Sequence, residues 1–537
     1  MKITFLGHAG FCVETQHAVV VADPWLSPTG AFDASWFQLP RNHHLGALVE
    51  ETLALPKAAK FVYVSHEHED HFDRGFLETL RNRNFTLVIP RFRRPGFRRA
   101  LADYRCEELI ATDDGQAVSF PGGELKLYLD DSELNRDSAL LLRAEGGVFL
   151  NLNDCRIFDR LRAISEAEGA IDVLTCQFSG ASWHPTCYEY SPEEFERISE
   201  AKVMSKFVTV ERAIDQLRPR IFLPSAGPVC FLDPELFELN FSSSGIYRRA
   251  PELLRFVGPA LERVGTVAFE VVPGDVLEVA TGRLLPCAGD RYEDANFVSY
   301  MRAYAAEYAD FFRERARAHA LVDADETLGR LKGELERKLE LLVLRERVTL
   351  PLYYGLRERP EAWLRVDFQN GRVDRAAGIV EPAYYSIVAA AWQISKVLDG
   401  EMSWENFALS FRVRLKRVPD MYRALIHAFL TLEKGDLYRF CKMLSEIESR
   451  KDRITVTAGG KAYAVNRYCP HNGGDLQQGW VEKDRYLVCP RHRWCFDLEE
   501  KGACTTNASS IFAEEVAVEA GALAVNTASR GGATRDG

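Results

Sequence analysis

The densest set of metal-binding side chains lies in the stretch Tyr63–Asp73, which reads YVSHEHEDHFD. Its ligand-type residues are His66, His68, Asp70 and His71. They follow the apolar run KFVYV, which is typical of a buried strand, so we expect them on the loop at that strand's carboxyl end. Imidazole and carboxylate groups suit zinc, iron or manganese, and four of them on one loop can surround one ion or two.

A second set lies near the C-terminus, in the segments YCPHNGG and VCPRHRWCF. Its members are Cys469, His471, Cys489 and His492. Two thiolates on one iron and two imidazoles on the other are the ligands of a Rieske [2Fe–2S] centre, and a C-x-H loop paired with a C-x-x-H loop supplies them. A zinc site is the alternative use of the same ligands. The aromatic residues Trp494 and Phe496 favour the cluster.

The two sets together indicate redox chemistry. A hydrolytic zinc centre has no use for a one-electron carrier, whereas iron that activates dioxygen must receive electrons one at a time. Two histidines and one carboxylate are enough to hold a single iron and leave positions open for dioxygen and substrate. We therefore expect an oxygenase, with the first centre as its catalytic site.

The elements that must position these residues divide the chain into three parts. Residues 1–290 alternate short β-rich runs with turns and a few amphipathic helices, which predicts a layered α/β domain. Residues 291–450 are mainly helical, with a β-like insert and its Asn370-Gly371 hairpin turn signal. Strands return in residues 451–526, and residues 527–537 are typical of a disordered tail.

Composition narrows the class of protein. The chain has 537 residues, 47% of them hydrophobic, and a net charge of -11, which argues against general affinity for nucleic acid or for anionic membrane. The opening MKITFLGHAGFCVET is strand-like, so we expect neither a signal peptide nor a membrane span. Twelve cysteines scattered through apolar contexts suit reduced thiols, and we expect a cytoplasmic protein.

The H-x-H-x-D-H pattern resembles the metallo-β-lactamase superfamily, and ITFLGHAGFCVE followed by VVADPWL resembles its first two strands. The resemblance implies an αββα sandwich and adds Asp154, in GVFLNLNDC, to the metal ligands. Two histidines of the usual pattern are absent, and Ser225 and Ala226 stand where the last ligand is expected. His184 and His8 are the candidate additions to the ligand set.

The order of DPWLSPTGAF, VYVSHEHEDHF, FLNLNDC, TCQFSGASW and later motifs is similar to CMP-N-acetylneuraminate hydroxylase across most of residues 1–430. In that family the Rieske domain comes first, whereas here it follows the metal domain. The resemblance implies hydroxylation with dioxygen, iron in the first domain, and electrons from an NAD(P)H reductase through a cytochrome b5 or ferredoxin-type carrier.

Two other functions remain open. A hydrolase with a regulatory Rieske domain predicts zinc, and a diiron protein that reduces oxygen predicts oxygen consumption without substrate. The substrate is expected to be a polar small molecule. Eight arginines lie in the segment from Arg81 to Arg105, and they could bind an anionic substrate such as a sugar nucleotide. A solvated surface is the alternative interpretation of this segment.

Overall fold

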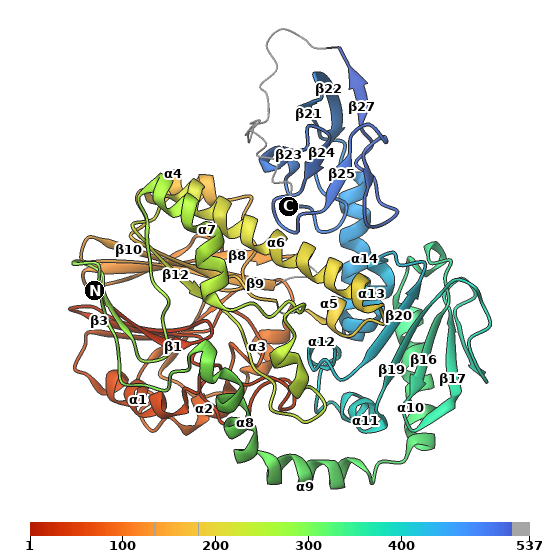
Figure 1. Cartoon of the computed structure of the whole chain (residues 1–537), viewed down its shortest axis with the longest axis horizontal. Helices are drawn as coiled ribbons and strands as arrows, with labels where there is room; N and C mark the ends of the chain where they lie inside the picture. Colours follow the sequence, from red (N-terminus) through yellow and green to blue (C-terminus); the bar gives the residue numbers. More distant parts are fainter. Residues whose placement is uncertain (133–135, 181, 518–537) are drawn as a thin grey trace.

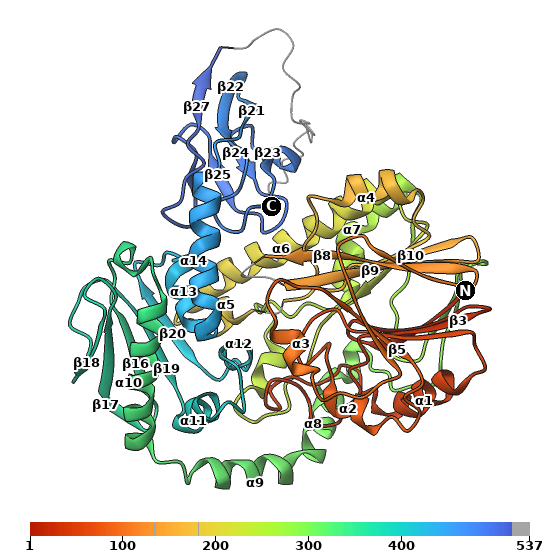
Figure 2. The ribbon, with the colours of Figure 1, turned by 180° about the vertical axis from the view of Figure 1, so that it is seen from behind.

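The computed structural model describes residues 1–132, 136–180 and 182–517. Figure 1 shows a two-sheet sandwich, a middle region beside it, and a small β domain that stands above the junction of the other two. Figure 2 shows the same three parts from behind. The tail expected at residues 527–537 lies outside the described residues, as does the end of the C-terminal domain from residue 518.

The first sheet of the sandwich has eight strands. In spatial order they are β15 (Arg283–Leu285), β14 (Val276–Glu278), β1 (Lys2–Gly7), β2 (Gly10–Glu14), β3 (Ala18–Ala22), β4 (Ala59–Tyr63), β5 (Thr86–Pro90) and β6 (Glu108–Thr112). Strands β3 to β6 run parallel, so their carboxyl ends meet at one edge. Strand β3 is buried along its whole length, as its sequence AVVVA requires.

The second sheet has seven strands and packs face to face on the first. In order they are β13 (Val267–Ala268), β12 (Ile221–Ser225), β11 (Val173–Gln177), β10 (Gly147–Asn151), β9 (Arg136–Ala144), β8 (Gly123–Asp131) and β7 (Ala117–Phe120). The ring centroids of Phe11 and Phe149, one from each sheet, lie 5.4 Å apart. The space between the sheets is therefore a packed apolar core.

Helices cover the outer face of each sheet (Figure 1). The first sheet is covered by α1 (Gly46–Ala54), α2 (Arg74–Thr79) and α3 (Gly96–Ala100), and the second by α4 (Leu161–Glu168), α6 (Pro192–Leu217) and α7 (Ala250–Val264). Helix α6 begins at a Ser191–Glu194 capping box with Pro192 in its first turn, which fixes its start. This arrangement confirms the expected αββα sandwich.

The middle region is reached through α8 (Phe297–Glu307) and α9 (Ala309–His319). Its other helices are α10 (Ala324–Leu341), α11 (Ala391–Asp399), α12 (Trp404–Leu409), α13 (Ala424–Thr431) and α14 (Lys434–Ser449). The short α5 (Trp183–Thr186) of the first domain contacts α13 through the rings of Trp183 and His427. They surround a five-stranded sheet in the order β18 (Arg372–Ala376), β17 (Arg359–Asp367), β16 (Leu352–Leu356), β19 (Tyr384–Ala389) and β20 (Arg414–Val418).

This sheet is larger than the hairpin expected from the sequence. The β17–β18 hairpin forms around Asn370 and Gly371, where Gly371 has a φ of +63°. Strand β20 lies outside the expected β-like insert, in a region that we predicted to be mainly helical. Its residues alternate, with Leu415 buried between the exposed Arg414 and Lys416, and this period of two prevails over the helical spacing on either side.

The C-terminal domain is all-β, as expected. One sheet contains β21 (Arg453–Ala458), β22 (Lys461–Asn466) and β27 (Glu514–Val516), and the other contains β23 (Trp480–Glu482), β24 (Tyr486–Val488), β25 (Cys495–Asp497) and β26 (Ala503–Cys504). Helix α14 leads into this domain from the middle region (Figures 1 and 2). Among the described residues, no helix combines the length and the apolar composition needed to cross a membrane.

Candidate metal centres

Loops at one edge of the sandwich carry the candidate ligands of the first centre. His8 follows β1, Asp23 follows β3, the His66–His71 loop follows β4, and Asp154 follows β10. His8, Asp23 and Asn153 have φ angles of +50°, +40° and +38°. This left-handed conformation costs energy for any residue with a side chain, and such residues cluster at functional sites.

Three of these side chains form a buried group that can hold a metal ion. Ligand atoms of His8, Asp70 and His71 all lie within 4.8 Å of one another. The Oδ1 atom of Asp154 approaches this group, 3.8 Å from His71 Nε2. Asp70 Oδ1, His71 Nε2 and Asp154 Oδ1 are buried without a hydrogen-bond partner. Such atoms are costly to bury, so the group fits a bound cation.

His66 and His68 lie beside this group. His66 Nε2 is 2.8 Å from His68 Nδ1, and the ring centroids of His66 and His71 are 4.2 Å apart. Two imidazole nitrogens at such a distance must share a proton or a cation. The structure thus brings together the five residues expected here, namely His66, His68, Asp70, His71 and Asp154, and adds His8 to them.

The electrostatics of the centre also suit a cation. Burial opposes ionisation of Asp70, but the adjacent His71 and the contact with His8 lower the pKa of Asp70 to about 2. Burial likewise disfavours a charged His71, yet Asp70 and a hydrogen bond to Asp23 raise the pKa of His71 to about 10. The centre is therefore rich in anionic charge that a proton on His71 or a metal ion has to balance.

Sequence reasoning missed two carboxylates of this centre. Asp137 on β9 is buried, with Oδ1 3.2 Å from His66 Nδ1, and burial followed by the nearby Asp154 raises the pKa of Asp137 well above its usual range. Asp23 Oδ2 lies 2.9 Å from His71 Nδ1, which leaves His71 Nε2 for the centre. The sequence feature that could have indicated Asp137 is its position as an acidic residue at the start of the apolar strand sequence DSALLL.

The middle region contributes a third missed carboxylate. Glu405 of α12 places Oε1 3.3 Å from His68 Nε2, and its Oε2 lies 3.2 Å from the guanidinium of Arg136. Burial opposes its ionisation, but the hydrogen bond from His68 lowers the pKa of Glu405. No local pattern marks Glu405, because its partners are more than two hundred residues away in the chain.

His184 is placed elsewhere, contrary to its inclusion among the expected ligands. Its Nε2 atom is 2.9 Å from the Tyr190 hydroxyl and 3.0 Å from Arg417 NH2. Tyr190 also donates to Asp420, 3.0 Å away, so the ring belongs to a polar network on the β20 side. Arg417 and Asp420 lie far along the chain, and the sequence around His184 gave no sign of them.

Two loops of the C-terminal domain bring Cys469, His471, Cys489 and His492 together. The Cys469 amide donates to Gly474 O and the Cys489 amide to Trp494 O, each at 2.9 Å, which closes the loops. The two thiols are buried and hydrogen-bonded to each other, and the ring centroids of the two histidines lie 4.7 Å apart.

This donor set fits a [2Fe–2S] cluster. Burial lowers the pKa of His471 to about 3, so its imidazole is neutral, and its buried Nδ1 atom has no hydrogen-bond partner. A Cβ atom at Gly474 would lie 3.0 Å from Cys489 Sγ, so glycine leaves room between the loops. The family model of the Rieske [2Fe-2S] domain matches residues 442–511. The C-terminal domain is a Rieske domain.

Comparisons with known proteins agree with this organisation. The model of the beta-lactamase superfamily domain matches residues 2–120. A Mycobacterium tuberculosis (strain H37Rv) protein, named as a Rieske 2Fe-2S iron-sulfur protein, is 29% identical over 528 residues, 94% of this chain and 98% of its own. Cytidine monophosphate-N-acetylneuraminic acid hydroxylase of Pan troglodytes is 21% identical over 468 residues, 79% of this chain and 71% of its own. The Homo sapiens relative, named as inactive, has the same identity and 83% coverage of its own length.

The Rieske domain docks on the metal domain through its cluster-binding loops. Arg491 lies between Cys489 and His492, and its guanidinium contacts Asp159 at 2.8 Å and Asp130 at 3.2 Å. Because these ion pairs are half-buried or better and involve the loop itself, they fix the cluster-binding loops against the metal domain.

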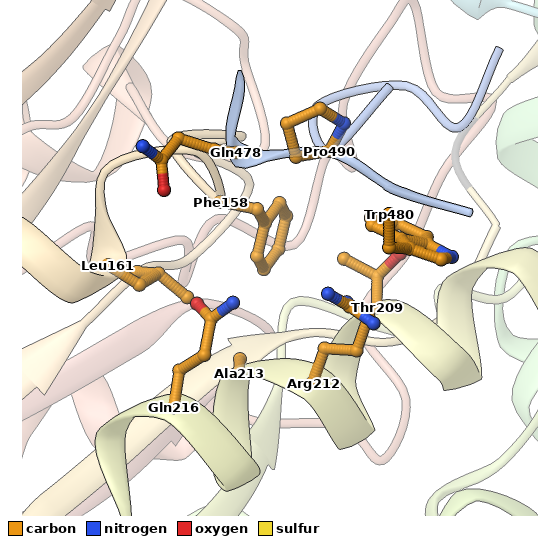
Figure 3. Close-up of a pocket in the computed structure, with 9 residues that line it drawn as sticks. All are labelled: Phe158, Leu161, Thr209, Arg212, Ala213, Gln216, Gln478, Trp480 and Pro490. Atoms are coloured by element: carbon orange, nitrogen blue, oxygen red, sulfur yellow. The ribbon is translucent and has the colours of Figure 1, made fainter. Parts of the chain in front are cut away.

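Two cavities lie along this interface. Figure 3 shows one of them, where Pro490, Gln478 and Trp480 of the Rieske domain face Phe158 and helix α6. The Arg212 guanidinium of α6 is 3.9 Å from the centroid of the Trp480 ring. The other cavity, of roughly 70 Å³, has both Asp154 and His492 in its wall. One small cavity therefore touches residues of both candidate centres.

Proposed function

We propose that the protein is a Rieske-dependent non-haem iron oxygenase. It would use dioxygen and externally supplied electrons to hydroxylate, or to N-oxygenate, a polar small molecule. The observation that carries this proposal is the cavity shared by Asp154 of the metal domain and His492 of the Rieske domain. It gives the electron carrier a destination within the same chain, which a hydrolase does not need.

In this proposal the first centre holds one or two iron ions, with zinc as the alternative metal. The residues assigned to it are His66, His68, Asp70, His71 and Asp154, with His8 and Asp137 as further ligands. Cys469, His471, Cys489 and His492 hold the Rieske cluster. When bound, the two groups supply one-electron transfer and dioxygen activation.

The chain's own residues have supporting tasks. Asp23 keeps the Nδ1 proton of His71 in place and so presents Nε2 to the centre. Glu405 holds the Nε2 atom of His68, which leaves Nδ1 of His68 facing His66. Arg491 holds the cluster loops against the metal domain. The docked Rieske loops form one wall of the cavity through Arg491, His492 and Arg493.

The proposal includes the partners and the setting. We expect a ferredoxin or a cytochrome b5-type donor with an NAD(P)H reductase, in the cytoplasm, where all twelve cysteines, which the structure shows without disulfides, stay reduced. The division at residues 290 and 450 into a metal domain, a middle region and the Rieske domain belongs to the same proposal. The 21% identity to the hydroxylase over 468 residues supports the reaction class.

The test is a single-turnover experiment. Protein loaded with iron and cluster is reduced without oxygen, mixed with aerated buffer containing sugar nucleotides or amines, and its products are analysed by mass spectrometry. We expect a gain of one oxygen atom that requires both the reductant and iron in the first centre. Hydrolysed product formed without reductant would overturn the proposal.

A further inference from the structure

The cavity shared by the two centres has an unusual charge balance. Arg156 and Lys206 line it together with Asp154, and Lys202 lies one turn before Lys206 on helix α6. Arg156 is close enough to both lysines to lower their pKa values. These three cations repel one another in a chain whose overall net charge is -11.

Arg156 has no counter-ion in the part of the chain that the structure describes. No carboxylate there lies within ion-pair distance of its guanidinium, and no hydrogen bond involves it, although its side chain is half-buried. The other arginines of this cavity differ, because Arg491 pairs with Asp159 and Arg493 pairs with Glu482. A half-buried guanidinium whose five N–H donors are unpaired is suited to bind an anionic hydrogen-bond acceptor.

The two lysines are satisfied by neutral groups alone. Lys202 Nζ donates to the His184 carbonyl at 2.7 Å, and Lys206 Nζ donates to the Ser179 carbonyl at 2.5 Å and to the Gln177 side chain. Burial, followed by Arg156, lowers the pKa of each lysine to about 7. Asp154 acts to raise the pKa of Lys206, but it belongs to the proposed first metal centre, where a bound metal would take up its charge.

The arginine-rich segment that first suggested an anionic substrate is different. Arg91 pairs with Asp113, Arg93 with Asp131, and Arg94 with Asp436. Three of its eight arginines are paired with carboxylates in this way, and most of the eight are exposed to solvent. Exposed arginines are solvated by water, so the half-buried Arg156 at the cavity is the stronger candidate for binding an anion.

We propose that Arg156 and Lys206, which line the cavity, form an anion-binding site that holds a carboxylate or phosphate group of the substrate between the two metal centres, with Lys202 adding positive charge from one turn before Lys206. Guanidinium and ammonium donors are the groups that proteins use for these anions. The cavity, of roughly 70 Å³, has room for one small polyatomic group in place of a few waters. This inference rests on the proposed function, because it takes the cavity to be the substrate site.

The first test uses inorganic phosphate and malonate as probes on the holoprotein. Binding is followed by calorimetry and by the shift of the reduced Rieske electron paramagnetic resonance signal, since His492 lines the same cavity. We expect Arg156→Gln to weaken binding at least about tenfold, which corresponds to the loss of one charge-assisted contact. Arg160→Gln is the matched control, because Arg160 pairs with Asp114 and does not line this cavity.

The outcomes separate cleanly. Binding of either probe that weakens in Arg156→Gln supports the site, and the probe that binds more tightly indicates whether the substrate anion is a phosphate or a carboxylate. Equal binding by Arg156→Gln and wild type, as expected for phosphate held by iron alone, overturns it, as does the absence of binding. Lys206→Met is the second variant and is expected to give the same loss if Arg156→Gln fails to fold.

The test also distinguishes this inference from the proposed function. Anion binding that depends on Arg156, in a protein without reductant-driven oxygenation, would leave the site standing and refute the oxygenase. Oxygenation of an anionic substrate with the same KM in wild type and Arg156→Gln would support the oxygenase and refute the anion-binding site.

Discussion

The two metal centres of this protein are assembled in opposite ways. The four residues of the Rieske centre come from two short loops between Cys469 and His492, and hydrogen bonds within each loop set their geometry. The first centre draws side chains from the ends of several strands of two sheets, and Glu405 of the middle region contacts it from outside. A local centre can be recognised from spacing, whereas a dispersed centre depends on the whole sandwich being folded.

The largest effect is expected at the local centre. Cys469→Ser removes one of two thiolates, so we expect the Rieske spectrum and all reductant-driven turnover to be lost, with iron in the first centre retained. Cys495→Ser is the control, because the Cys495 thiol donates to the Arg493 carbonyl, 3.5 Å away, and is not one of the four proposed cluster ligands. Electron paramagnetic resonance and metal analysis measure both. Full turnover in Cys469→Ser would show that the electron path is wrong.

The loss of one ligand is expected to weaken the dispersed centre rather than to abolish it. We expect His8→Gln and Asp137→Asn each to weaken metal binding in the first domain by about 100-fold or more, with the Rieske spectrum unchanged. The measurement is metal content after dialysis against graded chelator. His184→Gln is the matched control, since its ring bonds to Tyr190 and Arg417. Metal loss in that control and not in His8→Gln would reverse the assignment.

These residues show what the sequence can and cannot predict. The Rieske ligands and the His66–His71 loop are recognisable because their spacing is local, and the family comparison confirms the Rieske domain. His8 was a weaker candidate and Asp137 was missed, because only strand packing brings them to the loop. The ligand roles in the first centre remain predictions. His184 was predicted as a ligand of the first centre but lies elsewhere. The sequence did not reveal this, because its partner Arg417 is far along the chain.

A smaller effect is expected from the residue that links the middle region to the first centre. Glu405→Gln keeps the shape of the side chain but removes the charge that orients and polarises His68. We expect a loss of metal affinity of about 10-fold to 100-fold, as is usual for groups that hold a metal ligand in place. An unchanged chelator titration would show that the middle region has no part in the centre.

The smallest effect on either centre is expected for Lys338, a fully buried cation above the Trp404 ring with no hydrogen-bond partner among the described residues. Burial lowers its pKa from 10.5 to about 7. Between these values the unfolded chain holds more protons, so stability relative to Lys338→Met should rise by up to about 1.4 kcal/mol per pH unit. Denaturation midpoints from pH 6 to pH 10 measure this change.

Lys338→Met should leave the metal content of both centres unchanged, because its side chain contacts neither. A stability difference that falls as the pH rises would contradict the buried-cation interpretation. Loss of iron in this variant would show that the dispersed centre depends on the middle region more widely than through Glu405.

The most direct test of the central claim is the content of metal and acid-labile sulfide in anaerobically purified protein, with an electron paramagnetic resonance spectrum after reduction. The account predicts about three or four irons and about two sulfides per chain, with a Rieske spectrum, because cluster iron and catalytic iron are then both present. About two irons together with one or two zinc ions would contradict it, since electrons from the Rieske centre would have no oxygen-activating destination.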